Sequence, residues 1–76
     1  MVPTPMQCRA ARAMLDITRD ELSRRSGVSS GAIRGFEKGE TKFMRLNHEA
    51  IRQTFEQAGI VFIGKVGVEF RGAEQE

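Results

Sequence analysis

Serine, arginine and lysine side chains gather on one side of the segment 29–38. Ile33 and Phe36 are three residues apart, so in a helix they share one face. Ser30, Arg34 and Lys38 then lie away from this face. Hydroxyl, guanidinium and ammonium groups bind phosphate oxygens, and a guanidinium also binds the edge of a guanine base. The pattern is compatible with a nucleic-acid face, and the alternative is an ordinary solvated surface.

No catalytic constellation accompanies these residues. The chain has one cysteine, Cys8, and one histidine, His48, and its sequence shows no Ser/His/Asp set, no glycine-rich phosphate loop and no metal-ligand spacing. We expect Cys8 to be a small buried side chain and His48 to be solvated. The sequence predicts neither an enzyme nor a cofactor, metal or small-molecule site.

Capping signals predict two short helices in the middle of the chain. Thr18 and Glu21 have the spacing of a capping box, and Gly27 suits the left-handed conformation in which many helices end. Ser29 can cap a second helix, and Gly39 is placed to end it. Two short helices joined by a tight turn that contains glycine form a helix-turn-helix.

The run E-L-x-x-x-S-G-V-S-x-x-x-I-x-x-x-E-x-G, from Glu21 to Gly39, resembles the helix-turn-helix of the phage Cro/C1 repressor family, often called XRE-like. The resemblance extends upstream to Leu15 and downstream to about Gly59. It implies a mostly α fold, with a four-helix DNA-binding domain over residues 1–59. The ending resembles that of short bacterial members, which implies a bacterial or phage-encoded protein.

The resemblance also implies roles for individual residues. The family's base-facing positions correspond to Ser30, Gly31, Arg34 and Gly35. Its DNA backbone-contacting positions correspond to Arg19, Ser29, Lys38, Thr41 and Lys42. In this family an arginine of the first helix pairs with the glutamate that closes the third, which implies an ion pair between Arg12 and Glu37.

Two glycines depart from the family pattern. Typical members carry Gln, Arg, Asn or Ser where Gly31 and Gly35 stand. A glycine has no side chain with which to read a base, and each costs roughly 1 kcal/mol relative to alanine inside a helix. The pair could allow close approach to DNA, and it leaves Arg34 as the principal candidate for direct readout of guanine.

Two further helices are expected on either side of this motif. Thr4, followed by a proline, predicts a first helix that runs to Met14 or Leu15. Asn47 is a suitable N-cap and predicts a last helix over residues 48–58.

Alternating apolar residues predict a β-hairpin at 60–71. A two-residue turn at Gly64-Lys65 would pair Ile63 with Val66. Both faces of the first strand would then be apolar, and an isolated hairpin is marginally stable in water. We therefore expect a homodimer whose interface comprises Ile60, Phe62, Val66, Val68 and Phe70. The alternative is a hairpin that only closes the core of the monomer. The last residues, 72–76, are expected to form a disordered tail.

Composition and charge agree with a small regulator. The 76 residues make one domain, which is short enough to need help from oligomerisation. Residues 1–46 hold nine Lys or Arg against five Asp or Glu, whereas residues 47–76 hold three against five. This asymmetry suits a nucleic-acid face and a separate association face, and the alternative is an ordinary solvated surface. With no signal peptide, no membrane-spanning stretch and a lone thiol, a cytoplasmic location is expected.

The expected function is sequence-specific binding of double-stranded DNA by a homodimeric transcriptional regulator on an inverted-repeat operator. A protein partner such as polymerase or another regulator is also possible. The alternative is a helix-turn-helix protein-interaction module, an anti-activator or antitoxin, that does not itself read DNA.

Overall fold

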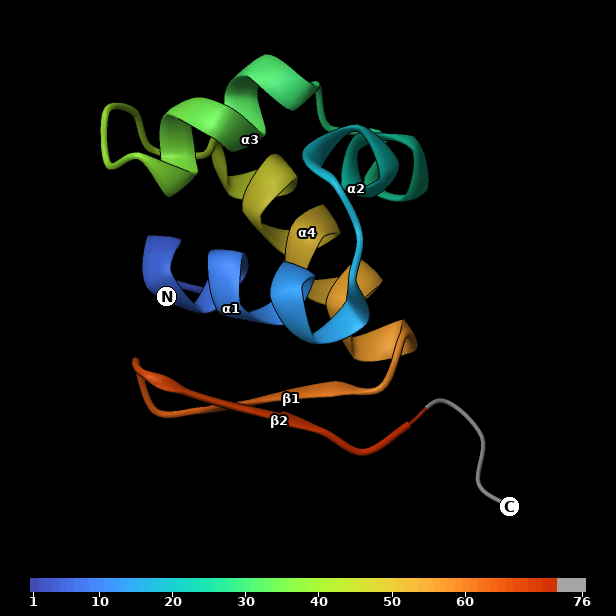
Figure 1. Ribbon diagram of the computed structural model, residues 1–76. Helices are drawn as coiled ribbons and strands as arrows, with labels where there is room; N and C mark the ends of the chain where they lie inside the picture. Colours follow the sequence, from blue (N-terminus) through green and yellow to red (C-terminus); the bar gives the residue numbers. More distant parts are fainter. Residues whose placement is uncertain (73–76) are drawn as a thin grey trace.

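The computed structural model describes residues 1–72 and shows four helices followed by a two-stranded antiparallel sheet (Figure 1). The elements, in chain order, are α1 (Pro5–Leu15), α2 (Arg19–Ser26), α3 (Ser30–Glu37), α4 (Arg45–Gln57), β1 (Ile60–Ile63) and β2 (Gly67–Phe70). This confirms the expectation of a mostly helical fold that ends in a β-hairpin. Of the expected tail at 72–76, only Gly72 lies within the described residues.

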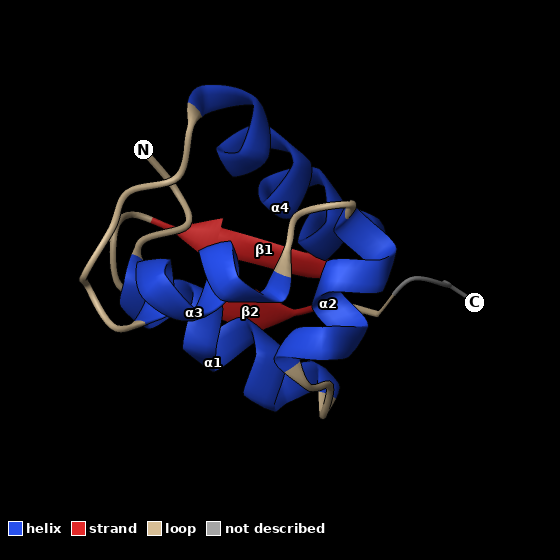
Figure 2. Ribbon diagram, turned by 90° about the horizontal axis from the view of Figure 1, so that it is seen from above, coloured by secondary structure: helices blue, strands red, loops and turns tan. Residues whose placement is uncertain are grey.

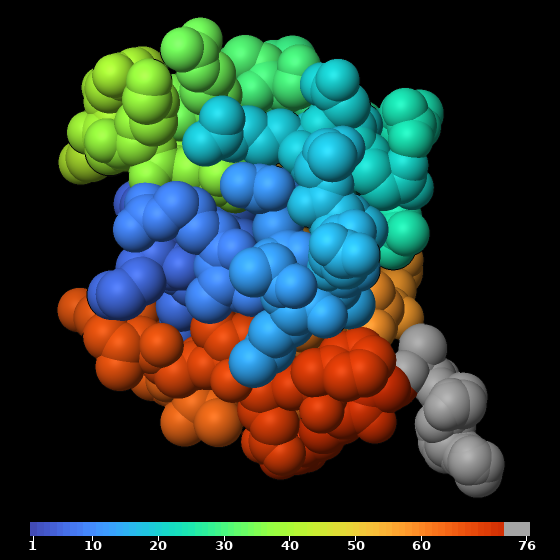
Figure 3. Space-filling view, in the orientation of Figure 1, coloured from blue at the N-terminus to red at the C-terminus, as the bar shows by residue number. Residues whose placement is uncertain are grey.

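The helices α1 and α4 lie in the middle of the molecule, between two outer layers. In Figure 1 α2 and α3 lie above them and the hairpin lies below. Figure 2 looks down through the helices onto the broad face of the sheet. In Figure 3 the green surface of α3 and the orange to red surface of the hairpin occupy opposite ends of the molecule. The surface of α3 is therefore remote from the hairpin.

Nine apolar side chains, each no more than 5% exposed, fill the space between the helices and the sheet. They come from all four helices, the α2–α3 turn and β1, and they are Cys8, Ala11, Leu22, Val28, Ile33, Phe36, Ile51, Phe55 and Ile60. Burial of apolar surface on this scale is the main favourable contribution to folding.

The first three helices begin where the capping residues predict. Thr4 Oγ1 accepts a hydrogen bond from the Gln7 N–H at 3.2 Å, and Thr18 Oγ1 accepts one from the Glu21 N–H at 3.0 Å. Ser29 Oγ accepts from the Ala32 N–H at the start of α3 at 3.2 Å. Each bond satisfies a backbone donor that has no partner inside its helix.

The expected start of α4 is wrong by three residues. The helix begins at Arg45, after Met44, and Asn47 lies inside its first turn. Met44 makes no side-chain cap. The ring of Phe43, just before the helix, stacks on Phe36 with centroids 4.0 Å apart. Tertiary packing thus fixes where α4 starts and outweighs the local capping preference of asparagine.

The expected hairpin register is also wrong. Three residues, 64–66, connect the strands, and Ile63 lies opposite Gly67 rather than Val66. A Cβ at residue 67 would lie 2.8 Å from the Ile63 carbonyl oxygen, so the position opposite Ile63 requires glycine. A one-residue change of register moves every side chain of a strand to the other face.

The observed register turns apolar side chains toward the chain's own helices. Ile60 is buried, and Phe62 and Val68, which lie opposite each other, pack against the core. These three residues, which were assigned to the dimer interface, therefore pack inside the monomer. Val66 and Phe70 stay 70% and 50% exposed, together with Ile63 at 54%, which was not among the assigned residues.

A buried glutamine of α1 holds the hairpin connection. The Gln7 Nε2 donates to the carbonyl oxygens of Gly64 and Gly67, both at 3.0 Å, and its Oε1 accepts from the Thr4 N–H at 2.9 Å. Thr4 Oγ1 donates to the Lys65 carbonyl oxygen at 3.0 Å. These bonds explain why a three-residue connection forms in place of the expected two-residue turn.

Replacing Gln7 by leucine, which is similar in size but apolar, should destabilise the fold. Three hydrogen bonds of the side-chain amide would be lost, and a typical intramolecular hydrogen bond contributes about 0.5–1.5 kcal/mol. Urea-induced unfolding measures the loss. Gln53→Leu, at an exposed position of α4, is the control and should change the free energy of unfolding by less than about 0.5 kcal/mol. Equal effects of the two substitutions would contradict this role of Gln7.

Candidate nucleic-acid interface

The N-terminal ends of α2 and α3 and the C-terminal end of α1 surround an open hollow of about 710 Å³. Both signs of charge line it: Arg19 and Arg34 stand with Asp16 and Asp20. The full lining is Arg12, Asp16, Ile17, Thr18, Arg19, Asp20, Ser30, Gly31 and Arg34. The hollow is thus the place where the polar side of α3 meets α2.

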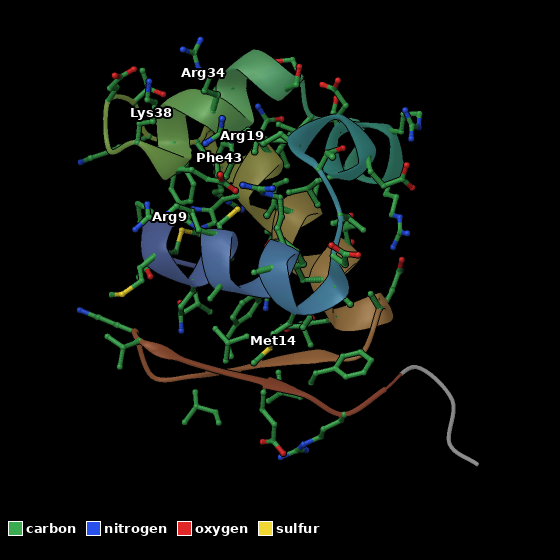
Figure 4. The ribbon with its side chains drawn as sticks, in the orientation of Figure 1. Arg9, Met14, Arg19, Arg34, Lys38 and Phe43 are labelled. Atoms are coloured by element: carbon green, nitrogen blue, oxygen red, sulfur yellow. The ribbon has the colours of Figure 1, made fainter. Side chains whose placement is uncertain are left out.

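Three of the four residues assigned to base contact lie together in this hollow: Ser30, Gly31 and Arg34. Figure 4 shows Arg34 pointing outward from α3, away from α1 and α4. Four of the assigned backbone-contacting residues are exposed on α3 or in the segments next to it, and they are Ser29, Lys38, Thr41 and Lys42. They lie outside the hollow, so the candidate interface is the hollow together with the exposed side of α3.

Gly35 serves the packing of the chain itself. A Cβ at residue 35 would lie 2.6 Å from Thr41 Oγ1. The Gly35 carbonyl oxygen accepts from the N–H groups of Glu40 and Thr41, at 2.8 and 3.2 Å. The turn after α3 folds back onto residue 35, so close packing within the protein accounts for this glycine.

Gly31 is different, because nothing in the described chain fills the space beside it. A Cβ at residue 31 would meet no atom within 4 Å. The two glycines, equivalent in the sequence pattern, therefore have different structural origins.

A buried carboxylate joins α1, α2 and α3. The side chain of Glu37 is fully buried at the end of α3. Arg12 Nε donates to its Oε2 and Arg12 Nη2 to its Oε1, both at 2.8 Å. The structure thus brings together the two residues of the expected ion pair, in the two-point geometry that arginine and carboxylate favour.

Arg19 also binds Glu37, which the sequence pattern did not indicate. Its Nε lies 2.9 Å from Glu37 Oε1, and 34% of its side chain is exposed. The Cys8 thiol donates to Oε2 at 3.1 Å, and Arg9 Nη1 donates to the Glu37 carbonyl oxygen. Arg19 is therefore held in place by the core carboxylate while it lines the hollow.

These contacts shift the pKa values of Glu37 and Cys8 in opposite directions. Burial raises the pKa of Glu37, but the hydrogen bonds from Arg12, Arg19 and Cys8 outweigh it, and the net pKa of Glu37 lies below its usual value. Burial, then the hydrogen bond to Glu37, raises the pKa of the Cys8 thiol. The expectation that Cys8 is a small buried side chain is confirmed.

Acid should destabilise the protein through Glu37. An unfolded glutamate has a pKa of about 4.3, so the folded state, with its lower pKa, binds the proton less readily than the unfolded state. The contribution of Glu37 is complete above this pH and is lost as the pH falls through the folded-state pKa. Urea unfolding between pH 7 and pH 3 should therefore show a shallower acid loss in Glu37→Gln than in the parent protein.

The matched control for this acid effect is Glu56→Gln, at an exposed position of α4. Its unfolding free energy should follow the pH dependence of the parent protein. If Glu37→Gln also followed the parent curve, the lowered pKa of Glu37 would be refuted.

His48 is buried, whereas the sequence had led us to expect a solvated side chain. It is 8% exposed, and its Nε2 lies 2.8 Å from the Pro3 carbonyl oxygen. Its ring meets those of Phe36 and Phe43 edge-on, with centroids 5.3 and 5.6 Å apart. The early start of α4 brings His48 under the Phe43 ring, where it joins the N-terminal segment to the end of α3.

No group of three or more His, Cys, Asp or Glu side chains that could hold a metal ion occurs within residues 1–72. Over the same range, no helix has the length and apolar character needed to cross a membrane.

Comparison with models of known protein families gives no match to this chain, and a search of curated proteins also finds none. The function therefore has to be inferred from the residues of the interface themselves.

Proposed function

We propose that the protein is a sequence-specific double-stranded DNA-binding transcriptional regulator, in which α2 and α3 form a helix-turn-helix and α3 enters the major groove. The observation that carries this proposal is a set of three cations that have no acidic partner. Arg34, Lys38 and Lys42 form no ion pair with any acidic residue in the described part of the chain. Their charge is available to a polyanion.

Three arginines of α2 and α4 differ in this respect. On α2, Arg24 and Arg25 both pair with Glu21, and on α4 Arg52 lies 3.9 Å from Glu49. The hydrogen bonds from Arg25 and Arg24 also lower the pKa of Glu21. Neutralised cations contribute less to phosphate binding, so the paired arginines of α2 and α4 suit DNA less well than residues 34, 38 and 42, which are three unpaired cations spaced four apart along α3 and the turn after it.

The proposed contacts follow from the docking geometry of a helix-turn-helix, whose second helix presents its N-terminal residues to base edges. Ser30 and Arg34 would reach bases, with Arg34 suited to guanine O6 and N7. Arg19, Lys38 and Lys42 would contact phosphates, and so would the hydroxyls of Ser29 and Thr41. Because Glu37 holds Arg19 in place, the remaining N–H groups of Arg19 would bind phosphate with less loss of side-chain entropy.

Salt dependence tests the proposal. Binding of the dimer to a random duplex should weaken roughly 10⁴-fold between 50 and 200 mM salt if each protomer neutralises about four phosphates, or about eight in all. Selection from a random DNA pool should then yield a preferred sequence. A protein that binds no duplex at low salt would instead fit the alternative of a protein-interaction module.

We further propose that the regulator acts as a homodimer joined through an open edge of the hairpin. Both α3 helices of a two-fold dimer must face the same DNA, and α3 lies on the opposite side of the molecule from the sheet (Figure 1). Packing two sheets face to face would turn the α3 helices away from each other. Edge-to-edge pairing, with the two-fold axis perpendicular to the sheet, keeps them on one side.

The edge of β2 offers backbone groups for such pairing. The Arg71 N–H donates to the Gly59 carbonyl oxygen, so residues 59 and 71 form a hydrogen-bonded pair. Hydrogen-bonded and non-hydrogen-bonded pairs alternate along an antiparallel ladder, so the backbone N–H and C=O groups of Val68 and Phe70 point away from β1. Two antiparallel β2 strands would then make a four-stranded sheet. The half-sites of the operator should be roughly 34 Å apart, or a multiple of this, in an inverted repeat.

Phe70→Pro should abolish the dimer, because proline removes an outward N–H without breaking the bonds to β1. Sedimentation velocity measures the oligomeric state. Phe70→Ala controls for loss of the ring, and Ile63→Glu controls for the outer face of the sheet. A monomeric Ile63→Glu with a dimeric Phe70→Pro would contradict pairing through the edge of β2.

A further inference from the structure

The described helices contain two glycines, Gly31 and Gly35, both in α3. Glycine is a poor helix former, so each lowers the stability of an eight-residue helix. Contact with Thr41 accounts for Gly35. The contacts within the described chain offer no such reason for Gly31.

Backbone conformation does not account for Gly31 either. The positive-φ glycines are at positions 27, 39, 59, 64 and 72, so residue 31 is not among them. An alanine at residue 31 would keep the helical conformation and would meet no atom within 4 Å. The absence of a side chain at residue 31 therefore leaves a gap at the surface, and no contact within the described residues requires that gap.

The position of the gap suggests what fills it. Gly31 is exposed and lines the hollow between α2 and α3, together with Arg19 and Arg34. Residues three apart share one side of a helix, so Arg34 projects beside the gap. A ligand that Arg34 binds in the hollow therefore lies on the same side of α3 as the main chain of residue 31.

We propose that DNA fills the space beside Gly31, and that this residue sets how deeply α3 enters the major groove. Without a Cβ, the main chain of α3 contacts the base edges directly, and Arg34 reaches the floor of the groove. A side chain at residue 31 holds the helix away from the bases. This inference rests on the proposed DNA-binding function and adds a residue that controls the depth of docking.

Gly31→Ala and Gly31→Leu separate this role from a structural one. Both should raise the melting temperature by several degrees, as expected when alanine or leucine replaces glycine in an exposed helix of a small domain. Both should weaken binding to the DNA selected by the parent protein, roughly tenfold for alanine and more for leucine. Ala13→Leu, at an exposed position of α1 outside the hollow, is the control for added bulk and should bind as the parent does.

The result that overturns the inference is equal DNA affinity of the parent protein and both Gly31 variants. A fall in melting temperature would also overturn it, because it would show that the glycine serves the fold. If the parent protein binds no DNA, the proposed function fails and this inference fails with it. If the parent protein and both Gly31 variants bind DNA equally well, the inference about Gly31 is refuted but the proposed DNA-binding function is not.

Discussion

Glu37→Ala is expected to lower the free energy of unfolding by about 3–5 kcal/mol, because it leaves the guanidinium groups of Arg12 and Arg19 without their buried partner. A domain of this size rarely has more than about 3–5 kcal/mol to lose. Much of the variant should therefore be unfolded at room temperature. Circular dichroism at 222 nm during urea titration measures the effect.

Two comparisons make this expectation specific. Glu40→Ala removes an exposed carboxylate three residues later and should be nearly neutral. Arg12→Ala should destabilise more than Arg9→Ala, because Arg12 binds the carboxylate through two nitrogens whereas the exposed Arg9 reaches only the Glu37 carbonyl oxygen. Equal melting temperatures for the two arginine variants would argue against a dominant contribution from the Arg12–Glu37 pair.

The second large effect is expected in DNA recognition. Arg34→Ala should reduce the preference for the selected sequence over random duplex by about 10- to 100-fold, which corresponds to roughly 1–3 kcal/mol. Lys42→Ala should weaken binding to all sequences alike and reduce the slope of affinity against salt by about one unit. Fluorescence anisotropy with the two duplexes at several salt concentrations measures both quantities.

Arg24→Ala is the matched control for these variants. Arg24 is an exposed arginine on α2 that already pairs with Glu21. Its removal should change neither the sequence preference nor the salt slope appreciably. If Arg34→Ala kept the full preference for the selected sequence, the proposed docking of α3 would be incorrect.

Local signals in the sequence were sufficient for the first three helices. A threonine or serine N-cap acts through a bond to a residue three positions later, so the information is contained in a few adjacent residues. Thr4, Thr18 and Ser29 each make this bond. The positions of α1, α2 and α3 could therefore be predicted without knowledge of the tertiary structure.

The start of α4 and the hairpin register could not be predicted in the same way. Both depend on partners far away in the sequence or on tertiary stacking. The ring of Phe43 is fixed by Phe36, and the hairpin connection is fixed by Gln7, 57 residues before Gly64. A capping or turn preference is worth too little to compete with such contacts.

The candidate interface also combines features that the local sequence predicts with features that depend on tertiary contacts. The exposure of Arg34 and Lys38 could be anticipated, because the apolar face of one helix determines its polar face. The contact of Arg19 with Glu37 could not, because it joins two helices. The difference between Gly31 and Gly35 also required the position of Thr41, which only the folded turn reveals.

The hydrogen bonds from Gln7 have a consequence for folding during synthesis. They span 57 and 60 residues, whereas Arg12 and Glu37 are separated by only 25. When the ribosome has released the three helices joined by Glu37, the partners of Gln7 have not yet emerged. The helical half can assemble early, but the Gln7 amide stays hydrated until the hairpin docks and replaces that water with its carbonyl oxygens. We therefore expect closure of this long loop to be a late step of folding during synthesis, on which the helices depend for their final stability.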